Sequence, residues 1–172
     1  NLDELTKVVK GTELVRFTYD DYGRVISIST GDGTVDYTYD EYGELVEKTY
    51  DNGQKISYSY DEYGRETGVT VSDGSDVEDS HILSSTSYEY DSFDRITRVI
   101  GHDGKATVYT YDANGNRETA TYANGVVLTY TYDECNHLIC EEVTDKNERL
   151  IAKYQYEIEG GERTKAVESG PD

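Results

Sequence analysis

Residues 37–45 read Tyr-Thr-Tyr-Asp-Glu-Tyr-Gly-Glu-Leu, a strand-like run followed at once by a turn-forming run. Tyr37 and Tyr39 are two residues apart, so both rings fall on one face of an extended chain. The carboxylate of Asp40 can accept a hydrogen bond from the backbone two residues on, and Gly43 can take a positive φ without a steric clash. The stretch therefore predicts a β-strand that ends in a tight turn.

The same unit recurs along the chain. Six copies carry an aromatic residue, a spacer, tyrosine (phenylalanine in one first position) and aspartate, and a degenerate seventh copy lies at residues 154–157. Self-similarity at a nearly fixed period is typical of a repeat architecture. The predicted structural turns begin at Asp20, Asp40, Asp61, Asp91, Asp112 and Asp133, and four of them contain Gly23, Gly43, Gly64 or Gly115. In the other two, Asp94 and Asn136 replace glycine and also tolerate the left-handed region.

Each period also predicts a second strand and a second turn. Asn-Gly or Asp-Gly pairs, as at residues 103–104 and 124–125, are strong hairpin signals. Val25 and Ile28 are three apart in such a second strand, which predicts a bulge or a strong twist. The fold class expected is all-β, with antiparallel β-hairpin repeats of about 21 residues forming a curved, spiralling sheet, because very broad open sheets curl.

The repeats define the expected domain organisation. The array should occupy residues 1–157, with a partial unit at 1–16, and residues 158–172 should form a frayed or irregular C-terminal tail. Tyrosine is a strong strand former, and the tyrosine pairs of the strands, from Tyr37 and Tyr39 to Tyr130 and Tyr132, should stack across strands into ladders and pack as the core. A sheet of this kind has two unpaired edges, so edge-to-edge self-association is expected.

Charge excludes several classes of partner. Lys and Arg number 16 against 36 Asp and Glu, which gives a net charge of −20 and argues against nucleic acid. No apolar run approaches the length of a membrane span, so no membrane insertion is expected.

The unit Tyr-x-Tyr-Asp-x-x-Gly-Arg, clearest at residues 37–45 and 58–65, resembles the YD repeat of the Rhs (rearrangement hotspot) family. That family includes Tc toxin shells, wall-associated proteins and teneurins. The resemblance implies a fragment of a repeat region, part of a β-shell that encloses or presents a C-terminal toxin or effector in a secreted or cell-surface parent chain. It also implies a link to carbohydrate binding. The proline-bearing core signature of full shells is missing, since the sole proline is Pro171.

The function predicted is structural and non-enzymatic. One aspartate in every period is what a turn requires, whereas glycoside hydrolysis needs one distinguished pair of carboxyl groups. The alternative is a carbohydrate-binding or adhesion module, because the turn aromatics could form an exposed row on which sugars stack. These possible glycan-binding residues are Tyr22, Tyr42, Tyr63 and Phe93, and packing of their rings against the neighbouring hairpin is the other interpretation.

No cofactor and no metal site are predicted. The acidic insert from Ser72 to Ser85 is either a Ca²⁺ site or a solvated loop, and its spacing favours the loop. His81, His102 and His137 fall in different periods without metal-ligand spacing and are treated as ordinary residues. Cys135 and Cys140 are too far apart along an extended strand for a disulfide, so free thiols are favoured over a bridge.

Overall fold

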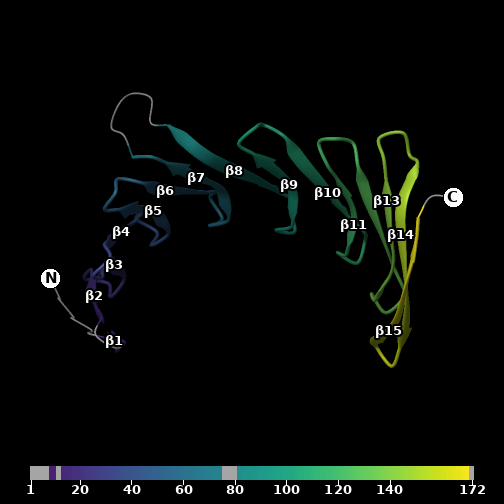
Figure 1. The fold of residues 1–172 in the computed structure, drawn as a ribbon, viewed down its shortest axis with the longest axis horizontal. Helices are drawn as coiled ribbons and strands as arrows, with labels where there is room; N and C mark the ends of the chain where they lie inside the picture. The colour runs from purple at the N-terminus through teal and green to yellow at the C-terminus, as the bar shows by residue number, and fades with distance from the viewer. Residues whose placement is uncertain (1–7, 11–12, 75–80, 171–172) are drawn as a thin grey trace. The chain divides into compact units, whose positions relative to one another are not determined.

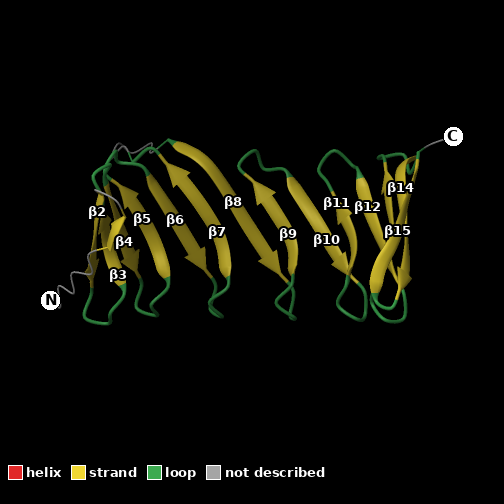
Figure 2. Cartoon of the chain, turned by 60° about the horizontal axis from the view of Figure 1, so that its bottom comes forward, coloured by secondary structure: helices red, strands yellow, loops and turns green. Residues whose placement is uncertain are grey.

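The structure is a computed structural model that describes residues 8–10, 13–74 and 81–170. The described residues form β-strands and turns without a helix (Figure 2), and hence without a helical segment fit to cross a membrane. The chain divides into two compact units, one ending at Ser87 and the other beginning at Tyr88.

Within each unit, every strand pairs antiparallel with the next strand along the chain, and successive strands lie side by side (Figure 1). Unit 1 contains β1 (Val8–Lys10), β2 (Glu13–Tyr19), β3 (Val25–Ser29), β4 (Thr34–Tyr39), β5 (Leu45–Tyr50), β6 (Lys55–Tyr60), β7 (Glu66–Ser72) and most of β8 (Ile82–Tyr90). Unit 2 contains β9 (Ile96–Gly101), β10 (Ala106–Tyr111), β11 (Arg117–Thr121), β12 (Val127–Tyr132), β13 (Leu138–Thr144), β14 (Leu150–Glu159) and β15 (Glu162–Ser169). The predicted all-β fold of antiparallel hairpin repeats is confirmed.

In five of the hairpins whose aspartate turns were predicted, the strand after the turn carries a bulge. In the β2–β3 hairpin, Thr18 pairs with Ser27 but Tyr19 pairs with Val25, so one residue of β3 is left over. The same shift occurs in the β4–β5, β6–β7, β10–β11 and β12–β13 hairpins. An extra residue moves the following side chains to the other face, which is why Val25 and Ile28 share a face despite their spacing. The predicted bulge is confirmed here.

The sheet has almost no enclosed core. Among the residues whose side chains are described, Ala120 alone is fully buried, at 1% exposure. In β4 the side chains of Tyr37 and Tyr39 are half-buried, while those of Asp36 and Thr38 are exposed, so the predicted alternation holds. The tyrosines thus cover one face of a sheet, and the expectation that they form a packed core is wrong.

The tyrosine ladders also differ from expectation. Tyr37 and Tyr58 do not stack on one another, because the Nζ atom of Lys48 lies between them, 6.0 and 5.5 Å from the two ring centroids. Phe17 and Tyr19 stack with centroids 6.5 Å apart, but along one strand and not across two. Strands that carry aromatic pairs alternate with strands that do not, so their rings are about 9.6 Å apart and leave room for a cation.

The C-terminal segment is a strand and not a frayed tail. Residues of β15 pair with β14 from Glu159–Glu162 at the turn to Lys153–Ser169 at the far end. Gly160 and Gly161 both have positive φ, 62° and 85°, the conformation that a two-residue hairpin turn requires. The glycine pair therefore marks a hairpin, and the prediction of an irregular tail at 158–172 is wrong for the described part.

Candidate functional site

The repeated aspartates hold the turns that close the hairpins. Oδ1 of Asp20 accepts hydrogen bonds from the backbone N–H groups of Tyr22 and Arg24, each at 2.9 Å. The N–H of Gly23 donates to the carbonyl of Asp20 at 3.0 Å, and Gly23 has a φ of 77°. The structure places the same pair of Oδ1 contacts at Asp40, Asp61, Asp91, Asp112 and Asp133.

A seventh turn of this type was not predicted from the sequence. Oδ1 of Asp145 accepts from the N–H groups of Asn147 and Arg149 at 2.8 and 3.0 Å. These contacts, led by the N–H of Arg149, lower the pKa of Asp145 to about 2. Glu148 takes the left-handed position with a φ of 62°, where glycine is the usual residue. The signal that could have found this turn is an aspartate followed four residues later by arginine, as at Asp20.

In several of these turns, the second carboxylate oxygen of the aspartate accepts a hydrogen bond from an arginine side chain. Nε of Arg24 donates to Oδ2 of Asp20 at 2.7 Å, and the guanidinium carbon lies 5.1 Å from the ring centroid of Tyr22 and 4.5 Å from that of Tyr39. Arg95 repeats the arrangement, 5.2 Å from Phe93 and 4.4 Å from Tyr111. Each arginine thus contacts both its own turn and the tyrosine of the next repeat.

Tyrosine hydroxyls connect successive hairpins. The hydroxyl of Tyr39 donates to the carbonyl oxygen of Val25 at 2.9 Å, beyond Ser27 and Asp36, the last backbone pair between β3 and β4. We call this contact the tyrosine latch. Further latches join Tyr60 to Leu45 at 2.9 Å, Tyr111 to Ile96 at 2.6 Å and Tyr132 to Arg117 at 3.0 Å.

The turn aromatics are the most exposed rings of the described chain. Tyr22, Tyr42 and Tyr63 of unit 1 are 86%, 82% and 74% exposed, and Phe93 of unit 2 is 76% exposed. An open cleft of about 520 Å³ is lined by Tyr22, Arg24, Asp40, Glu41, Tyr42 and Gly43. Such exposure leaves the ring faces accessible to solvent, so close packing against a neighbouring hairpin does not describe them.

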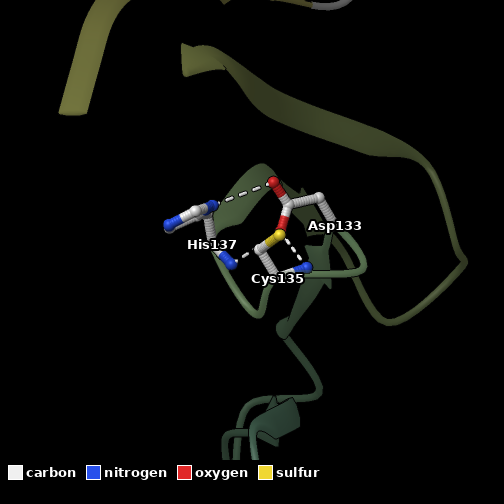
Figure 3. A group of neighbouring side chains, drawn as sticks. All are labelled: Asp133, Cys135 and His137. Carbon is white, nitrogen blue, oxygen red and sulfur yellow. Dashed lines mark hydrogen bonds and ion pairs between the residues drawn. The ribbon is translucent and has the colours of Figure 1, made fainter. Parts of the chain in front are cut away.

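The sixth aspartate turn contains a cluster of three different ligand types. A carboxylate oxygen of Asp133, the sulfur of Cys135 and a ring nitrogen of His137 lie within 4.8 Å of one another (Figure 3). Cys135 and Cys140 are both free thiols, as favoured from their spacing. Treating His137 as an ordinary residue missed this cluster, although Asp-x-Cys-x-His within one turn was a readable signal.

The acidic insert is only partly described. Asp73 and His81 flank it, with Oδ2 of Asp73 3.2 Å from Nδ1 of His81. Asp76, Glu78 and Asp79 lie outside the described residues, so a Ca²⁺ site in this insert stays a prediction.

Two family models match the sequence. The teneurin YD-shell model matches residues 3–81, and the RHS repeat model matches residues 90–127. No curated protein matches the sequence.

Solved structures share the fold. The crystal structure of TcdB2-TccC3-Cdc42 is 18% identical, with a TM-score of 0.73, and covers 91% of this chain but 9% of its own. A Tc holotoxin pore from Photorhabdus luminescens gives the same identity, coverage and TM-score. At this identity the likeness concerns the fold, and the chain spans about 9% of the length of the chains it matches.

Proposed function

We propose that the chain is a member of the YD-repeat, or Rhs, family and serves as a structural, non-enzymatic segment in the wall of a β-shell. The two family-model matches and the shared fold of the Tc toxin structures support this proposal. The parent chain would be a secreted or cell-surface protein whose shell encloses or presents a C-terminal toxin or effector. The observation that carries this proposal is the tyrosine latch, which recurs along the chain. In each latch, a tyrosine of the repeated unit holds one hairpin to the hairpin before it.

The state of the aspartates supports a structural role. In the turns of Asp20, Asp61 and Asp91, one carboxylate oxygen accepts two backbone N–H groups and the other pairs with an arginine. A general acid or base needs a carboxyl group that is placed to exchange a proton with a substrate. The repeated geometry of these turns engages both carboxylate oxygens in contacts within the protein itself.

Protease protection tests the shell proposal in the natural full-length product that contains this chain. With the wall intact, the C-terminal segment of the parent chain should resist cleavage. A variant that replaces the four latch tyrosines by phenylalanine (Tyr39, Tyr60, Tyr111 and Tyr132) should lose that resistance, because the hairpins separate more readily.

The exposed turn tyrosines provide a matched control. Replacing Tyr22, Tyr42 and Tyr63 by phenylalanine removes three hydroxyls and should leave protection unchanged. Equal cleavage of the C-terminal segment in the intact protein and in the latch variant, at the rate of an unenclosed domain, would contradict enclosure.

A second candidate function is carbohydrate binding at the cleft between Tyr22 and Tyr42. Exposed rings offer flat apolar faces, and Arg24 and Glu41 supply a hydrogen-bond donor and an acceptor beside them. Binding to a glycan array should fall when Tyr22 and Tyr42 are replaced by alanine. Tyr122→Ala, an exposed tyrosine in the β11–β12 turn, should have no effect. An array without any bound glycan would eliminate this candidate.

A further inference from the structure

The sixth aspartate turn differs from the other five turns predicted from the sequence by two side chains that can bind a metal ion. The third position of the turn holds Cys135 where the other repeats have Tyr22, Tyr42, Tyr63, Phe93 and Asn114. The fifth position holds His137 where they have Arg24, Glu44, Arg65, Arg95 and Asn116. Both replacements introduce side chains that bind transition metals, and both occur in the same turn.

The turn geometry brings these side chains together, and the two backbone N–H groups of the turn that donate to the Asp133 side chain use Oδ1 and not Oδ2. Oδ1 of Asp133 accepts from the N–H groups of Cys135 and His137 at 2.8 and 2.9 Å, which fixes the backbone. Oδ2 of Asp133 remains directed at Nδ1 of His137, 3.0 Å away. The sulfur of Cys135 lies beside them, so one oxygen, one sulfur and one nitrogen converge (Figure 3).

The second ring nitrogen of His137 faces the turn of the neighbouring β14–β15 hairpin. Nε2 of His137 lies 3.9 Å from the position that a Cβ atom would take on Gly161, in the β14–β15 turn. The ring therefore presents Nδ1 to the carboxylate and Nε2 to the adjacent turn, all within unit 2.

We propose that Asp133, Cys135 and His137 bind a divalent transition-metal ion of the Zn²⁺ type. Zn²⁺ takes tetrahedral sites made of thiolate, imidazole and carboxylate ligands, and an open site keeps water as its fourth ligand. The ion would lie between Nδ1 and Oδ2; a hydrogen carried on Nδ1 passes to solvent, and the neutral imidazole keeps its one hydrogen on Nε2. The thiol of Cys135 gives up its proton to solvent on binding, since thiolate is the ligand.

The sulfur and nitrogen ligands distinguish this site from the many surface carboxylates of the chain. With 36 acidic residues, oxygen ligands for weakly held cations are abundant. Thiolate and imidazole ligands favour Zn²⁺ and Co²⁺ over Ca²⁺ and Mg²⁺, which prefer oxygen. A spectroscopic signal from sulfur therefore reports a site at Cys135 or at Cys140, the two free thiols of the chain.

Titration of the intact chain with Co²⁺ and Zn²⁺ tests the site. Co²⁺ should produce a thiolate-to-cobalt charge-transfer band that saturates at one equivalent, and Zn²⁺ should abolish the band by displacement. The matched control is the double variant Cys135→Asn/His137→Asn, which copies the fifth turn, where Asn116 donates to Asp112 at 3.0 Å. This variant should keep the melting temperature of the metal-free protein, lose the band and bind Zn²⁺ at least about 100-fold more weakly, a larger loss than outer-shell changes cause.

Two more variants make the outcome decisive. Cys140→Ser should keep the band, because Cys140 lies outside the cluster. Asn114→Cys/Asn116→His should install a second site and raise the saturation to two equivalents. A missing band in the wild type, or a band that survives Cys135→Asn/His137→Asn, would overturn the proposal. Saturation at one equivalent in the transplanted variant would overturn the inference that the turn itself positions the ligands.

Discussion

A tyrosine hydroxyl joins hairpin to hairpin at the point where the backbone ladder between them ends. The latch of Tyr60 to the carbonyl of Leu45 should contribute as an ordinary neutral hydrogen bond. We expect Tyr60→Phe to lower the free energy of unfolding by about 0.5–1.5 kcal/mol in urea denaturation. Tyr42→Phe is the control, since its ring is exposed and its change should stay within about 0.5 kcal/mol. Equal effects of the two substitutions would contradict the latch.

The turn aspartates should make the fold sensitive to acid. Backbone N–H groups, first that of Arg149, lower the pKa of Asp145 to about 2, and a side-chain hydrogen bond from Arg95 leads the causes that lower the pKa of Asp91. In the window between about 2, the pKa of Asp145 in the folded chain, and the ordinary value of 3.8, the unfolded chain binds more protons than the folded chain. Stability is therefore full above the ordinary value and decreases as the pH falls through the window.

Thermal melts followed by circular dichroism should show a melting temperature that falls between about pH 4 and pH 2. Asp145→Asn keeps an oxygen for the cap but does not titrate, so its melting temperature should depend less on pH in that window. A variant whose pH profile is identical to that of the wild type would show that Asp145 does not contribute.

At the scale of the hairpin, one glycine conformation closes the turn. Gly23 has a φ of 77°, and a Cβ atom at this position would meet no other atom within 4 Å. The substitution Gly23→Ala therefore measures the free-energy cost of the left-handed backbone conformation without a steric clash. The left-handed region costs a residue with a Cβ atom about 1–2 kcal/mol, and we expect a loss of that size. Gly31 is the matched control because its surroundings are equally open and its φ is not positive. Gly31→Ala should leave the denaturation midpoint unchanged or raise it.

The strands and turns could be predicted because their signals are local. An alternating tyrosine pair and an Asp-x-x-Gly run determine a hairpin within about ten residues, and the offset of Val25 and Ile28 indicated the bulge. Contacts between hairpins were harder to predict from the sequence. The period showed that tyrosines recur but not that Lys48 lies between two rings, because the intervening strand decides that contact.

The missed features share a physical reason. At Glu148 the left-handed position is filled by a residue that seldom adopts it, so the turn lacked its usual marker. The cluster of Asp133, Cys135 and His137 forms because one turn brings its first, third and fifth residues together. The spacing between the three histidines, which lie in different periods, carries no sign of it. The functions of the exposed turn aromatics stay predictions.

At the scale of the molecule, stability depends on contacts between neighbouring strands because a packed core is nearly absent. Every residue of β15 is exposed, whereas β13 is half-buried along its length. Amides of β15 should therefore exchange with deuterium faster than those of β12 and β13, as measured by mass spectrometry. Slow exchange of β15 in dilute monomer would contradict this. Slower exchange with rising protein concentration would instead support edge-to-edge pairing of two copies.

Unit 2 has a mechanical property that follows from its strand order. Among the described strands, β15 is bonded to β14 and β14 in turn to β13, so tension applied to β15 loads one ladder at a time. Such a sheet should unfold one strand at a time. In a force-extension measurement, this gives a series of small, evenly spaced ruptures, one for each strand that separates. A single large rupture would require many ladders to be sheared together, whereas a pull on β15 acts first on the β14–β15 ladder.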